Sequence, residues 1–228
     1  MSRAVPYQPE VVPPTTQDLG DPKPTASRRD ELAAVTTGSV CLVWLPLGAG
    51  GRSVRWNGRV FEVLVARHQH REVKELYHSA LEVRLGLERF VIEMTPVWGN
   101  GSTDRGVVCV GSVGARWLGI SKLFRYEVRR WRDGQIGDID EATDRPLRVS
   151  HDASQARALL DSVPQVPAAT WGRDELGTGE MWNSNSLVAW LLARSGHDMT
   201  AITPPLGGRA PGWNAGLVLA ARDSVSRG

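Results

Sequence analysis

Cysteine is scarce in this sequence. The 228 residues include only Cys41 and Cys109, and they form no Cys-x-x-Cys pair. This argues against a disulfide framework and against a zinc knuckle, because both need several cysteines at short spacings. Each cysteine lies inside an apolar run, where a thiol behaves as a small buried hydrophobic group. We therefore expect both cysteines to be structural.

Long apolar runs and an excess of charge of one sign are also missing. No apolar stretch approaches the roughly 18 residues that a membrane span needs, and residues 1–6 lack the apolar core of a secretory signal. The 27 Lys and Arg against 25 Asp and Glu leave a formal charge of +2, so no global field favours nucleic acid or membranes. We expect a soluble, cytoplasmic protein with no membrane span and no nucleic-acid partner.

Familiar cofactor motifs are absent as well. Residues 207–213 are rich in glycine but contain neither a P-loop lysine nor a dinucleotide fingerprint. His68, His70 and Glu72 alternate along a predicted strand and would share one face, which would suit a metal ion. The basic residues around them favour an ordinary polar surface instead. We expect no cofactor and no metal.

The sequence does contain a marked change of composition near residue 36. Six of the 14 prolines fall within the first 24 residues, and such a segment cannot bury enough surface to offset its ordering entropy. We predict a disordered proline-rich tail over residues 1–35, which could tether a protein partner. The chain is 41% apolar and 23% charged, as globular proteins are, and we predict a single domain over residues 36–228.

Strand patterns dominate the first half of that domain. The apolar run at 41–47 and the β-rich segment at 59–67 read as a hairpin, with a turn at 48–51. A second hairpin is predicted over 76–85 and 89–97, joined at Gly86. A further strand is predicted over 124–132, and 217–220 could be a closing strand, whereas residues 107–120 permit either a strand or a packed loop.

Helix patterns appear only in the second half. Ser150 or Asp152 can cap a helix that runs to about Val163. A stronger helix is predicted over residues 184–195, with an apolar stripe, Asn and Ser at its start and Gly196 at its end. The expected fold class is α+β, an antiparallel sheet packed against two or three helices.

Polar side chains gather where the stronger helix begins, at Asn183, Ser184, Asn185 and Ser186. Unpaired backbone N–H groups and the positive end of the helix dipole meet there, which would favour a nucleophile or an anion. Asn and Ser are equally the preferred helix-capping residues, so a purely structural cap explains at least two of the four.

His78 and Glu93 lie on neighbouring predicted strands. An imidazole is the usual general base near neutral pH, and a carboxylate can orient it as the third member of a nucleophilic triad. Both residues also have structural interpretations, because His78 can simply belong to its strand and Glu93 can pair with Arg84 or Arg89. Local periodicity does not choose between these alternatives.

Cationic and aromatic residues flank the helix start. Arg173 and Arg209 are candidate clamps for a carboxylate or phosphate. Trp182 and Trp213 are candidate walls of a ligand cleft, together with Trp171. Ion pairing and core packing are the alternatives for these residues. The ligand-binding set predicted from the sequence, for a small molecule or peptide, comprises Arg173, Trp182, Asn183, Asn185, Ser186, Arg209 and Trp213.

The order of His78, Glu93 and then Asn183-Ser184-Asn185-Ser186-Leu187-Val188 resembles the circularly permuted papain-like superfamily. That superfamily includes NlpC-type peptidases and lecithin:retinol acyltransferase-like enzymes. The Asn-Ser-Asn-Ser segment is also similar to that of an uncharacterised bacterial domain family. The resemblance covers residues 76–216 and implies a permuted papain-like fold, with Ser184 at the position of the nucleophilic cysteine, His78 as base and Glu93 as the orienting residue.

Two hypotheses follow for function. The first is a serine-dependent amidase, esterase or acyltransferase, in which Ser184 attacks an acyl carbon and His78 takes its proton. The second is a catalytically inactive module of the same fold that binds a ligand or protein, because the cysteine of the family is missing. The first requires Ser184 within hydrogen-bond reach of His78 and open to a cleft. A buried Ser184 within a helix cap favours the second.

Overall fold

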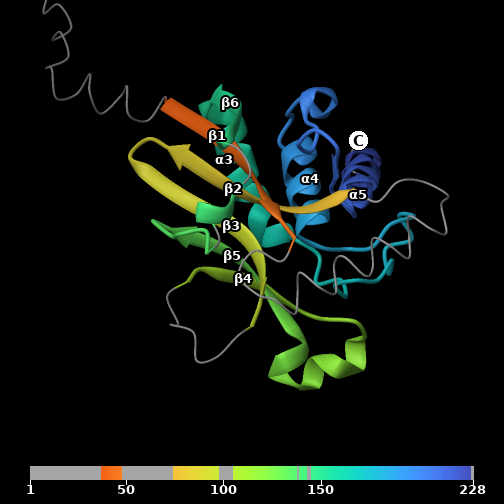
Figure 1. Cartoon of the computed structure of the whole chain (residues 1–228). Coiled ribbons are helices and arrows are strands. Elements are labelled where there is room, and N and C mark those ends of the chain that lie inside the picture. The colour runs from red at the N-terminus through yellow and green to blue at the C-terminus, as the bar shows by residue number, and fades with distance from the viewer. Residues whose placement is uncertain (1–36, 48–73, 98–104, 138, 143–144, 227–228) are drawn as a thin grey trace, which may run out of the picture.

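The structure is a computed structural model of the whole chain, and it describes residues 37–47, 74–97, 105–137, 139–142 and 145–226 (Figure 1). The predicted tail at 1–35 and the predicted turn at 48–51 lie outside these residues. The predicted strand at 59–67 and the residues His68, His70 and Glu72 lie outside them too.

The described residues form an α+β fold built on one seven-stranded sheet. The strands follow the order β4-β5-β3-β2-β1-β6, and every neighbouring pair on this path is antiparallel, while the short β7 pairs in parallel with the start of β2. The strands are β1 (Thr37–Pro46), β2 (Glu75–Leu85), β3 (Glu88–Pro96), β4 (Val107–Ser112), β5 (Arg125–Arg132), β6 (Leu147–Asp152) and β7 (Gly208–Arg209).

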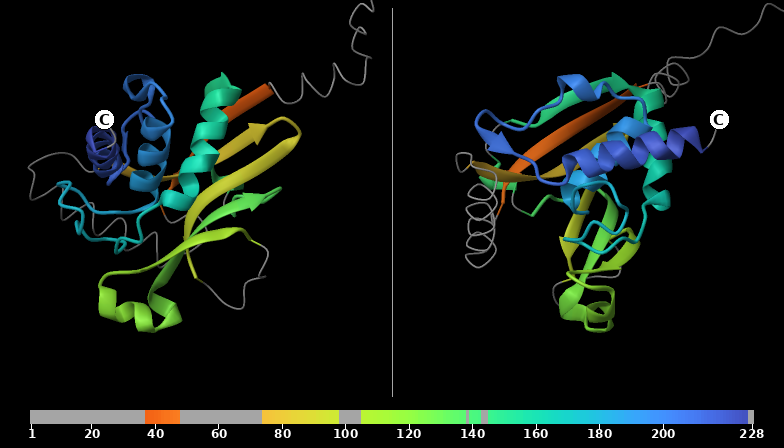
Figure 2. Two further views of the ribbon diagram at one scale, coloured as in Figure 1. Left: turned by 180° about the vertical axis from the view of Figure 1, so that it is seen from behind. Right: turned by 90° about the vertical axis from the view of Figure 1, so that its right-hand side faces the viewer.

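The helices lie on one face of this sheet (Figure 2). They are α3 (Ala153–Ser162), α4 (Ser184–Arg194) and α5 (Trp213–Val225). Short 3-10 turns occupy Arg116–Ile120 (η1), Lys122–Phe124 (η2), Ile139–Glu141, Val163–Gln165 and Met199–Ala201.

Alternation along the central strands divides the core between the two faces of the sheet. Tyr77, Leu81 and Val83 of β2 pack in the large cluster that contains the helices. Ala80 of β2 belongs instead to a small cluster with Val43, Leu45, Val91 and Ile136. Because successive strand side chains point to opposite faces, this division fixes which β2 residues face α4.

Most elements predicted from periodicity are present. The hairpin at 76–85 and 89–97 is β2 and β3, with Gly86 at a positive φ of 61° in the turn, a conformation that glycine adopts without strain. The strand at 124–132 is β5, and both predicted helices are present as α3, capped by Asp152, and α4. Residues 107–112 form β4, and the chain from 116 continues as 3-10 turns.

The prediction of a closing strand at 217–220 is wrong, because these residues lie inside helix α5. A short apolar run does not distinguish a strand from a buried helix. Gly216 lets α5 lie directly against α4, since a Cβ there would be 2.2 Å from the carbonyl oxygen of Ser186. The close contact between α5 and α4 therefore requires a residue without a Cβ at position 216.

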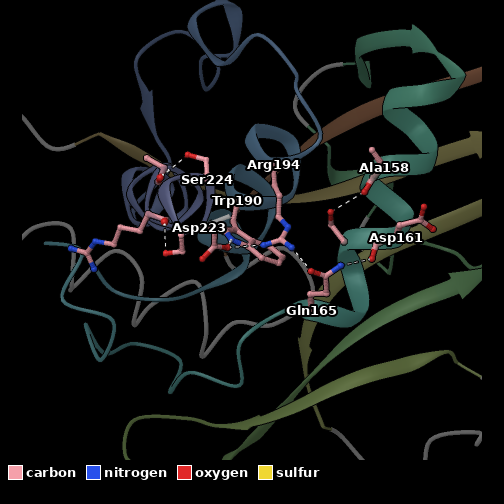
Figure 3. Close-up of polar contacts among 11 residues, drawn as sticks. Ala158, Asp161, Gln165, Trp190, Arg194, Asp223 and Ser224 are labelled. Atoms are coloured by element: carbon pink, nitrogen blue, oxygen red, sulfur yellow. Dashed lines mark hydrogen bonds and ion pairs between the residues drawn. The ribbon is translucent and has the colours of Figure 1, made fainter. Parts of the chain in front are cut away.

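A polar network ties α5 to α4 and to the end of α3 (Figure 3). Asp223 accepts hydrogen bonds from the indole N–H of Trp190 at 2.9 Å and from the guanidinium of Arg194 at 2.8 Å. Arg194 stacks over the Trp190 ring and also bonds Gln165, which follows α3. The Asp223 carboxylate thus satisfies two donors on α4 at once.

The described helices are all too short or too polar to cross a membrane.

Candidate functional site

The start of α4 is a complete helix cap. The side-chain carbonyl of Asn183 accepts from the backbone N–H of Asn185 at 2.9 Å and of Ser186 at 3.2 Å. The Ser186 hydroxyl accepts in return from the backbone N–H of Asn183 at 3.1 Å, which completes a capping box. The Asn183 amide also donates to the carbonyl of Pro211 at 2.8 Å. Asn183 and Ser186 are therefore committed to backbone partners.

Asn185 joins three segments that are distant in the sequence. Its side-chain amide donates to the carbonyls of Tyr77 and Pro211, each at 2.9 Å, and its carbonyl oxygen accepts from the hydroxyl of Ser79 at 2.9 Å. The residue is only 2% exposed. Strand β3 pairs with β2 only from Leu81 onward. At Tyr77, before that pairing starts, the side chain of Asn185 supplies a hydrogen-bond donor to the β2 backbone.

Ser184, the candidate nucleophile from the sequence, is buried with 4% of its surface exposed. Within the part of the chain that the structure describes, its hydroxyl has no hydrogen-bond partner. It is the first residue of α4, flanked by Asn183 and Asn185. The hydroxyl is therefore neither a cap nor bonded to a described base.

His78 lies on the face of β2 opposite to α4. Its neighbours Tyr77 and Ser79 both face the helices, because Tyr77 packs in the large cluster and Ser79 bonds Asn185. The β1–β2 register continues without a shift through His78, which pairs with Leu45. The structure therefore places the sheet between the imidazole of His78 and Ser184 and does not bring the two together.

The surroundings of His78 favour its neutral form. Burial lowers the pKa of its imidazole from 6.5 to about 4, because desolvation penalises the charged ring. A base with so low a pKa is a weak acceptor of a serine proton at neutral pH. His78 is a half-buried strand residue whose imidazole is largely desolvated.

Glu93 lies on the same side of the sheet as His78, since it alternates with Ile92 and Met94, which face the helices. Its carboxylate pairs with Arg129 of β5 at 3.0 Å, and Arg129 also pairs with Glu127. Burial raises the pKa of Glu93, and the attraction of Arg129 opposes this. The partner of Glu93 is thus neither Arg84 nor Arg89, both of which pair with Glu82.

The remaining predicted ligand-binding residues are dispersed. Trp182 is 1% exposed inside the core, and Trp213 packs on Trp44 with ring centroids 5.2 Å apart. Arg173 donates to the carbonyl of Gly114 at 2.6 Å, whereas Arg209 lies on β7 opposite Leu76. These contacts are structural, and they do not form one cleft around Ser184. No group of three metal-ligating side chains occurs among the described residues.

The structure also has a surface feature that the sequence reasoning missed. A shallow hollow of about 540 Å³ lies beside β4, and Arg116 and Arg125 line it together with Val110, Gly111, Ser112, Gly119, Ile120 and Ala168. Ile120 is 85% exposed, and Trp117 and Leu123, three residues before and after it, are 71% and 83% exposed. A sequence signal existed, because residues 106–126 contain no acidic residue while several large apolar residues interrupt a glycine-rich segment.

Comparison with known proteins found no match for this chain among family models, curated proteins or solved structures.

Replacing His78 with glutamine should reduce the loss of stability on acidification. The folded-state pKa near 4 lies below the unfolded value of 6.5, so the unfolded chain binds the proton first. The neutral His78 therefore contributes to the free energy of unfolding above about pH 6.5. This stability is lost as the pH falls towards 4, by about 1.4 kcal/mol per pH unit, or roughly 2 kcal/mol by pH 5. Urea unfolding near pH 7.5 and pH 5 measures the difference. Equal acid sensitivity of wild type and variant would show that the imidazole of His78 is not held in its neutral form by desolvation.

Proposed function

We propose that this chain is a non-catalytic binding module with a permuted papain-like fold. The observation that carries the proposal is the use of Asn185, whose side chain joins α4 to β2 and to the segment before α5. The segment that the resemblance aligns with the start of a catalytic helix thus holds α4, β2 and the segment before α5 together. Asn183 and Ser186 support the same interpretation, because both are occupied in the cap.

The location of His78 supports the module over the serine hydrolase. A Ser–His mechanism needs the hydroxyl within hydrogen-bond reach of the imidazole and accessible to substrate. Here Ser184 is 4% exposed, and the sheet separates it from His78. A serine hydroxyl without a base is a poor nucleophile at neutral pH, so hydrolysis through Ser184 is disfavoured.

The binding surface in this proposal is the exposed apolar group of Trp117, Ile120 and Leu123. Large apolar side chains that gather on the surface of a folded domain mark interaction sites. Their exposed fractions of 71%, 85% and 83% mean that they contribute little to the core. They are therefore available to a partner.

A fluorophosphonate probe tests the non-catalytic part of the proposal. We expect no adduct at Ser184 in the wild-type protein, and the same mass spectrum for Ser184→Ala, under conditions in which an active serine hydrolase in the same tube is fully labelled. An adduct at Ser184 that disappears in Ser184→Ala and in His78→Ala would establish an activated nucleophile and overturn the proposal.

A stability measurement tests the role of the exposed apolar group. The triple variant Trp117→Ser/Ile120→Ser/Leu123→Ser should unfold in urea within about 1 kcal/mol of wild type, because exposed substitutions usually change stability by less than about 0.5 kcal/mol each. A loss of several kcal/mol would show that these side chains hold the fold together, and would remove the binding surface from the proposal.

A further inference from the structure

The exposed apolar residues belong to one protrusion, which we call the projecting segment and define as residues 114–125. It follows β4, contains η1 and η2, and extends away from the sheet and the helices as the green coil at the bottom of Figures 1 and 2. Residues three apart lie on the same side of a 3-10 helix, so Trp117 and Ile120 share a side of η1. Leu123 follows at the same spacing in η2.

Several backbone groups of the projecting segment are paired within the segment itself. The N–H groups of Leu118, Ser121 and Phe124 donate to carbonyls three residues earlier, at 3.0–3.1 Å. Arg125 donates to the carbonyls of Gly119 at 2.5 Å and Ile120 at 3.3 Å. Unpaired backbone groups are what makes irregular chain costly in an apolar medium. This segment can therefore enter such a medium at reduced cost.

The charge of the projecting segment has one sign. Arg116, Lys122 and Arg125 are its ionisable residues, and no acidic residue occurs from 106 to 126. Arg116 pairs with Glu175 at its base, yet its side chain remains 81% exposed. Arg116 and Arg125 also line the shallow hollow beside the apolar side chains. The chain as a whole is nearly neutral, so this positive charge is local.

We propose that the projecting segment docks this protein on an anionic lipid bilayer. Trp117, Ile120 and Leu123 enter the headgroup region, where tryptophan is favoured and where buried apolar area supplies binding energy. Lys122 remains at the surface and attracts anionic headgroups, whereas the charge of Arg116 is partly compensated by Glu175. The segment projects from the rest of the domain, and such a shape fits a flat, deformable surface, while the hollow beside it is shallow and lined by Arg116 and Arg125. The inference rests on the proposed function, since it names the partner of that surface.

Co-sedimentation of the full chain with lipid vesicles tests the proposal. We expect the wild type to sediment with vesicles that contain phosphatidylserine, and much less with pure phosphatidylcholine. The triple variant Trp117→Ser/Ile120→Ser/Leu123→Ser should lose at least tenfold in partition coefficient. Lys122→Glu should lose at least about fivefold on the anionic vesicles alone, since one cation near such a surface contributes about that factor. Added salt should weaken wild-type binding.

The matched control is Leu87→Ser. Leu87 is 94% exposed in the β2–β3 turn, which lies apart from the projecting segment (Figure 1). This variant should sediment like wild type. A fluorescence control uses Trp117, because vesicles should shift the tryptophan emission of wild type to the blue and leave that of Trp117→Ser unshifted.

Three outcomes would overturn the lipid assignment. They are no sedimentation of wild type with anionic vesicles, equal sedimentation of the triple variant, and a concentration-dependent dimer that the triple variant abolishes. The last would make a second copy of the chain the occupant of the surface. Any of these with Ser184 unlabelled leaves the non-catalytic assignment standing, whereas labelling at Ser184 refutes that assignment whatever the vesicles show.

Discussion

Replacing Asn185 with leucine is expected to lower the free energy of unfolding by roughly 3–5 kcal/mol. The change removes three hydrogen bonds and leaves the hydroxyl of Ser79, 1% exposed, and the carbonyl of Tyr77 without their partner on α4. Each buried polar group left unsatisfied costs about 1–3 kcal/mol. Urea or thermal unfolding monitored by circular dichroism measures the loss.

The sequence supplies a matched control one residue earlier. Ser184 is buried in the same turn of α4 but its hydroxyl bonds no described residue, so Ser184→Ala should cost less than about 1 kcal/mol. Asn185→Asp should be as harmful as the leucine variant, because a carboxylate would face the carbonyls of Tyr77 and Pro211. Similar stabilities of Asn185→Leu and Ser184→Ala would show that the hydrogen bonds of Asn185 to β2 and Pro211 do not stabilise the fold.

Replacing Asp223 with alanine is expected to destabilise the fold by roughly 2–4 kcal/mol. The side chain of Arg194 is 9% exposed and Trp190 is 1% exposed, and Asp223 is the acceptor for donors of both (Figure 3). Removing one partner of a buried ion pair is strongly destabilising, and Arg194 would keep only its bond to Gln165 and its contact with the Trp190 ring. Guanidinium unfolding, followed by the fluorescence of tryptophan, measures the effect.

Asp161→Ala is the control for that measurement. Asp161 is exposed on α3, and only its backbone carbonyl takes part in the contacts of Figure 3, where it accepts from Gln165. We expect a change within about 0.5 kcal/mol, as for most surface substitutions. Asp223→Asn should recover part of the stability, because an amide oxygen still accepts from Trp190 while the charge attraction to Arg194 is lost. Equal stability of Asp223→Ala and Asp161→Ala would contradict the proposed role of Asp223.

The helix start illustrates how far a local pattern reaches. Asn183 before an apolar stripe predicted a capped helix, and the capping box with Ser186 confirms it. The same four residues also suggested a nucleophile, because the N–H groups that a cap satisfies would equally bind an anion. The contacts of Asn185 with Tyr77, Ser79 and Pro211 involve residues up to 108 positions away. No local pattern contains that information.

His78 shows a second limit of prediction from the sequence. Its strand was predicted, and strand alternation states that His78 and Ser79 face opposite ways. Which of the two faces α4 depends on how the sheet packs, and the flanking residues Tyr77 and Ser79 are polar enough to suit either side. The structure places Ser79 toward the helices. Alternation therefore predicted the relation between neighbours, and packing decided its direction.

The sequence by itself determined the elements whose signals are local. These are the hairpin around Gly86, the strand at 124–132 and the helices that begin after Asp152 and Asn183, because propensity, capping and periodicity act over a few residues. Only the tertiary structure decided that 217–220 is helical, that Asn185 bonds β2, and that Trp117, Ile120 and Leu123 remain exposed. Each of these depends on which surfaces meet, and that is set by the burial of apolar area over the whole domain.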